Sequence, residues 1–160
     1  MRPLVGIHIC LTMWLAAATP QGAAAQEGRA PYCADLDRIA GLAATTAKFS
    51  AITGEAREGD FSDTTVPLTG WADCSVYGPR TYTCDSATFK TPEETEQAIE
   101  RTALQIAACP TSAWRRRQPL SSPSYVVLSN STAPVSITLS TAQTDNHEFL
   151  VRLILFARRE

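Results

Sequence analysis

The stretch from residue 71 to residue 109 constrains the fold most, because it holds two strand patterns, a turn, a helix signal and three cysteines. Apolar and polar residues alternate in both strand patterns, as expected of strands with one buried face. The first pattern places Ala72, Cys74 and Val76 on one face, and Trp71, Asp73, Ser75 and Tyr77 on the other. The second separates Tyr82, Cys84 and Ser86 from Thr81, Thr83 and Asp85. The stretch therefore predicts a β-hairpin followed by a helix.

The sequence Gly78-Pro79-Arg80 predicts the turn of this hairpin, since proline presets the backbone φ that a turn requires. A three-residue turn would pair Tyr77 with Thr81 and set Cys74 opposite Cys84. An even-numbered turn would offset these pairs by one residue, so the spacing leaves two registers open.

A helix is predicted from Pro92 to residue 108. Thr91 suits the N-cap, proline suits the first helical position, and Glu94 stands three residues after the cap, which is the pattern of a capping box. Cys109-Pro110 marks the end of the helix. The acidic residues of the first turn fit the positive end of the helix dipole better than a cation site.

The N-terminal 25 residues have the pattern of a signal peptide. Arg2 supplies a positive charge, Leu4–Ala18 is mostly apolar, and Ala23-Ala24-Ala25 offers small residues for cleavage. The apolar run is short for a membrane span, and a retained N-terminal anchor is the alternative. We therefore expect residues 1–25 to be removed and residues 26–160 to form a single domain, either periplasmic or secreted.

Removal of the signal peptide leaves four cysteines, an even number that predicts two disulfides in an oxidising compartment: Cys33, Cys74, Cys84 and Cys109. The favoured pairing joins the hairpin cysteines as Cys74–Cys84 and the helix-end cysteines as Cys33–Cys109. The rival pairing bonds each strand cysteine to a helix cysteine. A zinc site of Cys74, Cys84 and His147 is disfavoured, because its spacing matches no usual zinc motif. No metal and no cofactor are expected.

The N-terminal part of the domain predicts a helix, a loop and an edge strand. Apolar residues recur at helical spacing between residues 33 and 50, at Leu36, Ile39, Ala40, Ala43 and Ala47. Residues 52–63 are polar and predict a solvated loop, whose carboxylates lack the spacing of a calcium-binding loop. Residues 64–69 predict a strand at an edge, because Pro67 cannot donate a backbone hydrogen bond.

The C-terminal part predicts strands separated by turn residues, over residues 113–118, 125–128, 135–140 and 147–158. The last of these is apolar on both faces, which favours a central position in a sheet. With the hairpin and the two helices, the order is a helix, two or three strands, a helix and then three or four strands, which is α-β-β-α-β-β-β when the edge strand and the strand over residues 113–118 are left out. We therefore expect an α+β fold in which an antiparallel sheet of about five strands carries two helices packed on one face, with two disulfides.

Charge and motifs disfavour several classes of function. The net charge of −2 makes nucleic acid a poor partner, and twelve arginines against two lysines are typical of a GC-rich bacterial genome. After signal removal one histidine remains, His147, and no nucleophile elbow, zinc-protease or phosphate-loop motif accompanies it. A site of His147, Asp145 and a serine is the catalytic alternative. The favoured interpretation contains no catalytic residue.

Aromatic and arginine side chains are the candidate binding residues: Trp114, Arg115, Arg117, Trp71 and Tyr77. The Trp114–Arg117 run could grip an acidic partner, since arginine forks and an indole are frequent interface anchors. The structural alternative is an edge strand whose charges prevent aggregation, with Trp114 turned into the core. Trp71 and Tyr77 form a second candidate surface, or lie beneath the loop of residues 52–63.

These patterns together predict a small exported binding domain stabilised by disulfides, such as an inhibitor, an immunity protein or an envelope assembly factor. Its expected partner is another envelope or secreted protein, with no nucleic acid and no membrane span after signal cleavage. A small exported hydrolase that uses His147 is the alternative.

Overall fold

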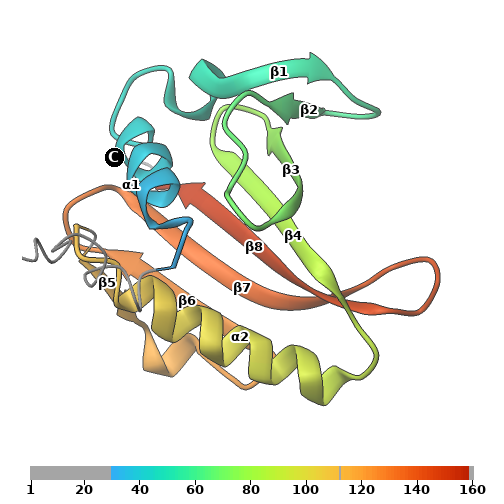
Figure 1. The fold of residues 1–160 in the computed structure, drawn as a ribbon. Coiled ribbons are helices and arrows are strands. Elements are labelled where there is room, and N and C mark those ends of the chain that lie inside the picture. Colours follow the sequence, from blue (N-terminus) through green and yellow to red (C-terminus); the bar gives the residue numbers. More distant parts are fainter. Residues whose placement is uncertain (1–29, 112, 159–160) are drawn as a thin grey trace, which may run out of the picture.

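The computed structural model describes residues 30–158 apart from residue 112, so the expected signal peptide lies outside the described residues. Within these residues, eight strands form one antiparallel sheet in the order β1-β2-β3-β4-β8-β7-β6-β5 (Figure 1). The strands are β1 (Thr53–Ala56), β2 (Phe61–Thr64), β3 (Ala72–Tyr77), β4 (Thr81–Phe89), β5 (Trp114–Arg116), β6 (Tyr125–Asn130), β7 (Val135–Gln143) and β8 (Phe149–Ala157). The helices are α1 (Cys33–Leu42), the 3-10 helix η1 (Lys48–Ile52), α2 (Pro92–Ala107) and the 3-10 helix η2 (Gln118–Leu120). The α+β class with an antiparallel sheet is confirmed.

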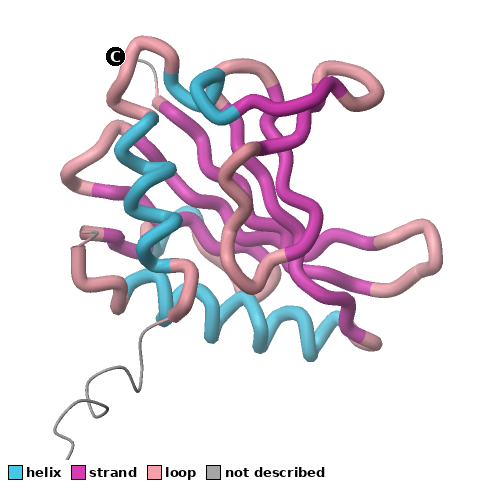
Figure 2. Tube along the Cα trace, turned by 45° about the horizontal axis from the view of Figure 1, so that its top comes forward, coloured by secondary structure: helices cyan, strands magenta, loops and turns pink. Residues whose placement is uncertain are grey.

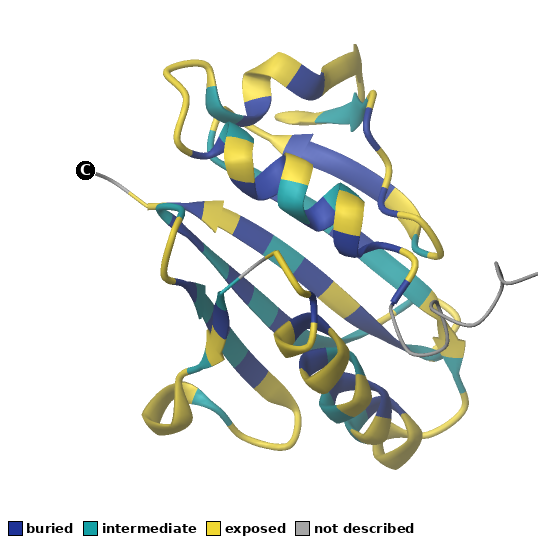
Figure 3. Cartoon of the chain, turned by 60° about the vertical axis from the view of Figure 1, so that its left-hand side comes forward, coloured by how far each residue is buried: buried dark blue, intermediate teal, exposed yellow. Residues whose placement is uncertain are grey.

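Helix α2 lies along one face of the sheet and closely approaches β4, β5, β6, β7 and β8. Its buried side chains include Ile99, Ala103 and Ile106, and the strands below contribute Ile137 and Leu153 to the same core. Fully burying a large aliphatic side chain stabilises a fold by about 1.5–3 kcal/mol. This helix-on-sheet layer therefore supplies much of the core, and Figure 3 shows both α-helices on the same side of the sheet.

Helix α1 packs differently from the prediction. A helix over residues 33–50 was expected, but α1 ends at Leu42, where the Thr45 hydroxyl donates a hydrogen bond to the Leu42 carbonyl and η1 follows. Threonine side chains that bind nearby backbone groups compete with helical hydrogen bonds, which explains the early end. The backbone of α1 comes closest to η1 rather than lying along the strands. The Asp35 side chain connects α1 to Thr69, whose backbone N–H and hydroxyl both donate hydrogen bonds to the Asp35 carboxylate.

The sheet contains eight strands where about five were expected. The main addition is the hairpin of β1 and β2, within the segment predicted as a solvated loop. All four residues of β1 are exposed, so the segment has no alternating apolar pattern to mark it as a strand. The predicted edge strand over residues 64–69 is not formed beyond Thr64, where β2 ends.

The hairpin of β3 and β4 has the register of a three-residue turn, with Tyr77 opposite Thr81. Gly78 has a φ of 55°, in the left-handed region that glycine adopts without steric cost. The two disulfides are present as Cys33–Cys109, 76 residues apart in sequence, and Cys74–Cys84, 10 residues apart. This is the pairing favoured from the sequence, in which one bridge ties the hairpin and the other ties α1 to the end of α2.

Two further predictions are confirmed. Thr91 caps α2, because its hydroxyl accepts from the Glu94 backbone N–H while the Glu94 carboxylate accepts from the Thr91 N–H. Strand β8 lies centrally, between β4 and β7, as its two apolar faces predicted. Among the residues described, no helix is long and apolar enough to cross a membrane.

The capping box generates a stability prediction. Thr91→Ala should lower the free energy of unfolding by about 1 kcal/mol, because the Glu94 N–H loses its acceptor. Thr91→Ser keeps the hydroxyl and is the matched control, with a change of less than about 0.5 kcal/mol. Urea unfolding followed by circular dichroism measures both. Equal stability of the two variants would contradict the role of the cap.

The disulfides generate a second prediction. Loss of Cys33–Cys109 through a C33S/C109S variant should cost about 4 kcal/mol, and loss of Cys74–Cys84 through C74S/C84S about 3 kcal/mol, in the chain-entropy model. The larger loop carries the larger cost, because its closure removes more freedom from the unfolded chain. Chemical denaturation of both variants, beside the oxidised wild type, checks the order. A greater loss from C74S/C84S would contradict it.

Candidate functional site

The face of the sheet opposite α2 carries polar and aromatic side chains in cross-strand rows. Strand pairing places one row in the order Phe61, Tyr77, Thr81, Phe156, Ser136, Ser129 and Arg115. A second row runs in the order Asp63, Ser75, Thr83, Ile154, Thr138 and Val127. Neither α1 nor α2 covers these residues, so we call this surface the open face.

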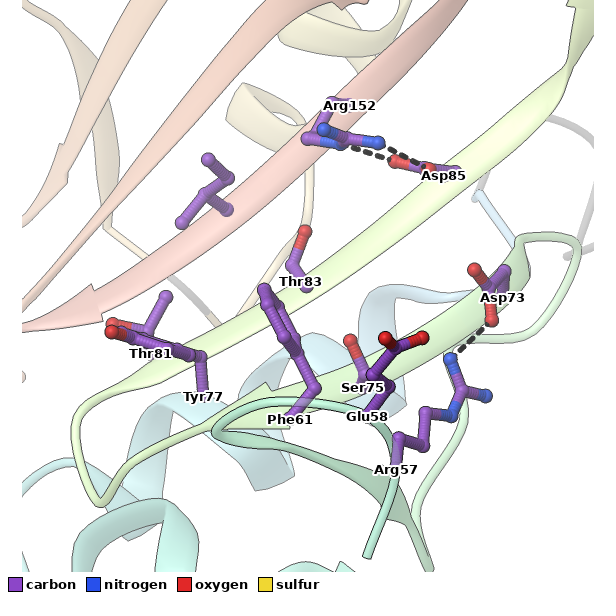
Figure 4. Close-up of a pocket in the computed structure, with 11 residues that line it drawn as sticks. Arg57, Glu58, Phe61, Asp73, Ser75, Tyr77, Thr81, Thr83, Asp85 and Arg152 are labelled. Carbon is purple, nitrogen blue, oxygen red and sulfur yellow. Dashed lines mark hydrogen bonds and ion pairs between the residues drawn. The ribbon is translucent and has the colours of Figure 1, made fainter. Parts of the chain in front are cut away.

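A hollow of about 440 Å³ lies on the open face over β2, β3, β4 and β8. It is lined by Arg57, Glu58, Phe61, Asp73, Ser75, Tyr77, Thr81, Thr83, Asp85, Arg152 and Ile154. Ligand pockets commonly have volumes of about 300–1,000 Å³, so the hollow has room for a side chain or a small molecule. Figure 4 shows its lining residues, with Phe61 rising beside Thr83.

Aromatic rings form one wall of the hollow. The rings of Phe61 and Tyr77 are tilted against each other with centroids 5.0 Å apart, and 42% and 44% of these residues remain exposed. The pairing of β2 with β3 places the two residues directly opposite each other. Exposed aromatic pairs of this kind offer an apolar contact surface that the fold itself does not use.

Ion pairs bound the hollow. The Arg152 guanidinium donates to both oxygens of Asp85, over 2.7 and 2.8 Å, and this hydrogen-bonded carboxylate raises the pKa of Arg152. Arg57 donates to Asp73 over 2.6 Å and also to Asp63, and these hydrogen bonds raise the pKa of Arg57. Both cations of the hollow are therefore already bound to carboxylates.

Some polar groups of the hollow have no carboxylate or other hydrogen-bond partner within residues 30–158 apart from residue 112. The Thr83 hydroxyl is buried and makes no hydrogen bond in this part of the chain, and Ser75, at the paired position of β3, lines the hollow beside it. The Glu58 carboxylate makes neither an ion pair nor a hydrogen bond there. Buried polar atoms are normally hydrogen-bonded, so the unused Thr83 hydroxyl on the floor of the hollow favours a binding site.

The candidate binding residues named from the sequence are dispersed. Tyr77 lines the hollow and Arg115 lies on the open face, whereas Arg117 is exposed beyond the end of β5. Trp71 packs edge-on against Tyr32, with ring centroids 6.3 Å apart, and so lies away from Tyr77. Trp114 is only 4% exposed and belongs to the core, as in the structural alternative.

Several residues of the hollow were not among the candidate binding residues named from the sequence: Glu58, Phe61, Asp85 and Arg152. One signal was available for Arg152, the single charged residue within the apolar run of β8. The alternation that put Cys74 on the core face likewise put Ser75 on the opposite face. Glu58 was considered only among the carboxylates of the disfavoured calcium loop, and Phe61 gave no signal, because it lies in a polar segment without periodicity.

His147 lies in the turn between β7 and β8, which extends beyond the rest of the sheet (Figure 2). It is exposed and has a φ of 61°. Within the part of the chain that the structure describes, its ring makes no hydrogen bond to a carboxylate or a serine. Cys74 and Cys84 are disulfide-bonded, and no group of residues suited to hold a metal ion occurs among the described residues.

Comparison with known proteins finds no matching family model, no similar curated protein and no similar solved structure. The geometry of the hollow therefore carries the functional argument.

The Asp85–Arg152 pair generates a third prediction. A double-mutant cycle of Asp85→Asn and Arg152→Gln should give a coupling free energy of about 0.5–1 kcal/mol, because the bidentate pair is partly shielded from water. The cycle of Lys90→Gln and Glu148→Gln is the control, since that pair is 3.6 Å apart and Lys90 is largely exposed. Its coupling should be near zero. Urea unfolding measures both cycles, and equal couplings would contradict the difference.

Proposed function

We propose that this chain is an exported, non-catalytic binding domain that recognises a protein partner through the open face. The observation that carries the proposal is the uncovered hollow, where an aromatic wall and the unused Thr83 hydroxyl meet on one surface. The cores of protein interfaces are enriched in tyrosine and phenylalanine, and polar groups around them provide specificity. The hollow has both components.

The two disulfides support export. Disulfides persist in oxidising compartments, and the N-terminal residues have the composition of a signal peptide. We place the protein in the periplasm or among secreted proteins, after cleavage at residue 25. Inhibitors, immunity proteins and envelope assembly factors are the classes of binding protein that fit this compartment and size.

The paired strands beneath the hollow favour binding by a surface that is already formed before the partner binds. Apart from Arg57 and Glu58 in the turn between β1 and β2, the lining residues lie on paired strands, two of which the Cys74–Cys84 bridge joins directly. Sites on strands hold their side chains with less freedom than sites on loops, so less entropy is lost when a partner binds.

A photo-crosslinking experiment tests this function. A photoreactive amino acid at Tyr77 should crosslink a partner in the exported fraction of the cells that naturally make this protein, because this side chain lies in the proposed contact surface. The same group at Leu104, 62% exposed on α2, is the matched control and should not capture that partner. Mass spectrometry identifies the crosslinked protein.

Phe61→Arg should abolish the crosslink from Tyr77, since it fills the hollow and removes one ring of the aromatic wall. His147→Ala should leave the crosslink unchanged. Capture from Leu104 alone, or no capture from Tyr77, would overturn the open face as the contact surface.

A further inference from the structure

The charges around the hollow do not balance. Two arginines and three carboxylates line it, and Asp73 and Asp85 are each bound to one of the arginines. Asp63, just outside the lining, shares the guanidinium of Arg57. Glu58 remains as the acidic group without a cationic partner among the described residues. A ligand that completes the charge balance of the hollow is therefore a cation.

The floor of the hollow adds hydrogen-bond acceptors. Ser75 is only 5% exposed and its side chain lines the hollow (Figure 4). The Thr83 hydroxyl, at the paired position of β4, is buried and has no hydrogen-bond partner in the described chain. Hydroxyl oxygens accept hydrogen bonds from ammonium and guanidinium groups. Both guanidinium groups of the lining are engaged, so an anion would meet a carboxylate without a free cation to offset it.

The aromatic wall suits the same kind of ligand. Ring faces attract cations, and the open face already contains one such contact, in which the Arg80 guanidinium lies 4.9 Å from the ring centroid of Phe156. Phe61 and Tyr77 lie in the same cross-strand row and have no cation over their rings among the described residues. Ile154 adds an apolar surface for the stem of a long side chain.

From these three observations we infer that the hollow binds an organic cation on an apolar stem, presented as a lysine or arginine side chain of the protein partner. The inference rests on the proposed function and specifies its chemistry. The cation lies between the Glu58 carboxylate and the aromatic wall, and the hydroxyls of Ser75 and Thr83 accept its hydrogen bonds. A free alkylamine has the same chemistry, and the experiment separates the two sources.

Titration by NMR of the oxidised mature chain tests the inference with three probes. These are a blocked peptide Gly-Ser-Lys-Ser-Gly, the same peptide with norleucine in place of lysine, and butylamine. The lysine peptide should shift the amide resonances of β3 and β4 and bind about tenfold more tightly than the norleucine peptide, which keeps the stem without the charge. Butylamine should bind more weakly than the lysine peptide, because it lacks the backbone contacts of a protein partner.

Glu58→Gln should weaken binding of the lysine peptide about tenfold and leave the norleucine peptide unchanged. Asp60→Asn is the matched control, since it removes the same charge from the same turn outside the lining of the hollow. It should change the affinity less than about twofold, as a screened surface charge does.

Four results would overturn the inference. Equal affinity for the lysine and norleucine peptides, or equal effects of Glu58→Gln and Asp60→Asn, would show that the charge of the ligand is not recognised. Equal binding of butylamine and the lysine peptide would refute a protein side chain as the source. Absence of any change in the amide resonances of β3 and β4 on addition of the lysine peptide would refute the cation site. In each case, a partner crosslinked from Tyr77 would still support the proposed binding function. Failure of the cation inference can therefore be distinguished from failure of the proposed function.

Discussion

The ladder between β4 and β8 is the interaction on which the rest of the structure depends. Strands β1 to β4 form one half of the sheet and strands β5 to β8 the other, and this ladder is where the halves meet. It pairs residues far apart in sequence, from Thr81 opposite Phe156 to Phe89 opposite Phe149. Long-range pairing of this kind closes large loops, so its entropic cost must be offset by the burial that it makes possible.

Other features reinforce that junction. Helix α2 spans it on the core face and approaches strands of both halves, while the bidentate Asp85–Arg152 pair crosses it on the open face. The Cys33–Cys109 bridge connects the start of α1 to the chain just after α2. Placing both helices and this bridge on one side leaves the polar rows of the other side uncovered. The hollow is therefore a consequence of how the two halves are joined.

Local signals in the sequence predicted the parts of the fold that depend on local chemistry. The capping box at Thr91 and the turn at Gly78 each involve a few neighbouring residues, and both were anticipated. The three-residue turn favoured the Cys74–Cys84 bridge, whereas the Cys33–Cys109 bridge was inferred from the two helix ends meeting on the sheet. Strand β1 at the sheet edge and strand β2 beside it were missed, because their mostly polar residues show no apolar alternation. The premature end of α1 depended on the Thr45 side chain, which apolar periodicity does not record.

The hollow was predictable only in part, because it forms from segments that the β4–β8 ladder brings together. Tyr77, named from the sequence as a candidate binding residue, lines the hollow together with Asp73 and Ser75 of the predicted polar face. Trp71, predicted on the same face, packs against Tyr32 instead. Phe61 and Ile154 come from strands on either side of the hairpin, and no local pattern relates them to Tyr77.

The Cys74–Cys84 disulfide covalently links the two strands that form the floor of the hollow. Ser75 and Thr83 directly neighbour these cysteines in sequence, with side chains on the opposite face of the same two strands. A bond formed on the core face thus sets the spacing of two hydroxyls on the outer face. The surface proposed for recognition is therefore completed by the same oxidation that forms this bridge. A newly made, reduced chain carries every residue of the hollow but lacks the crosslink that holds its floor in register.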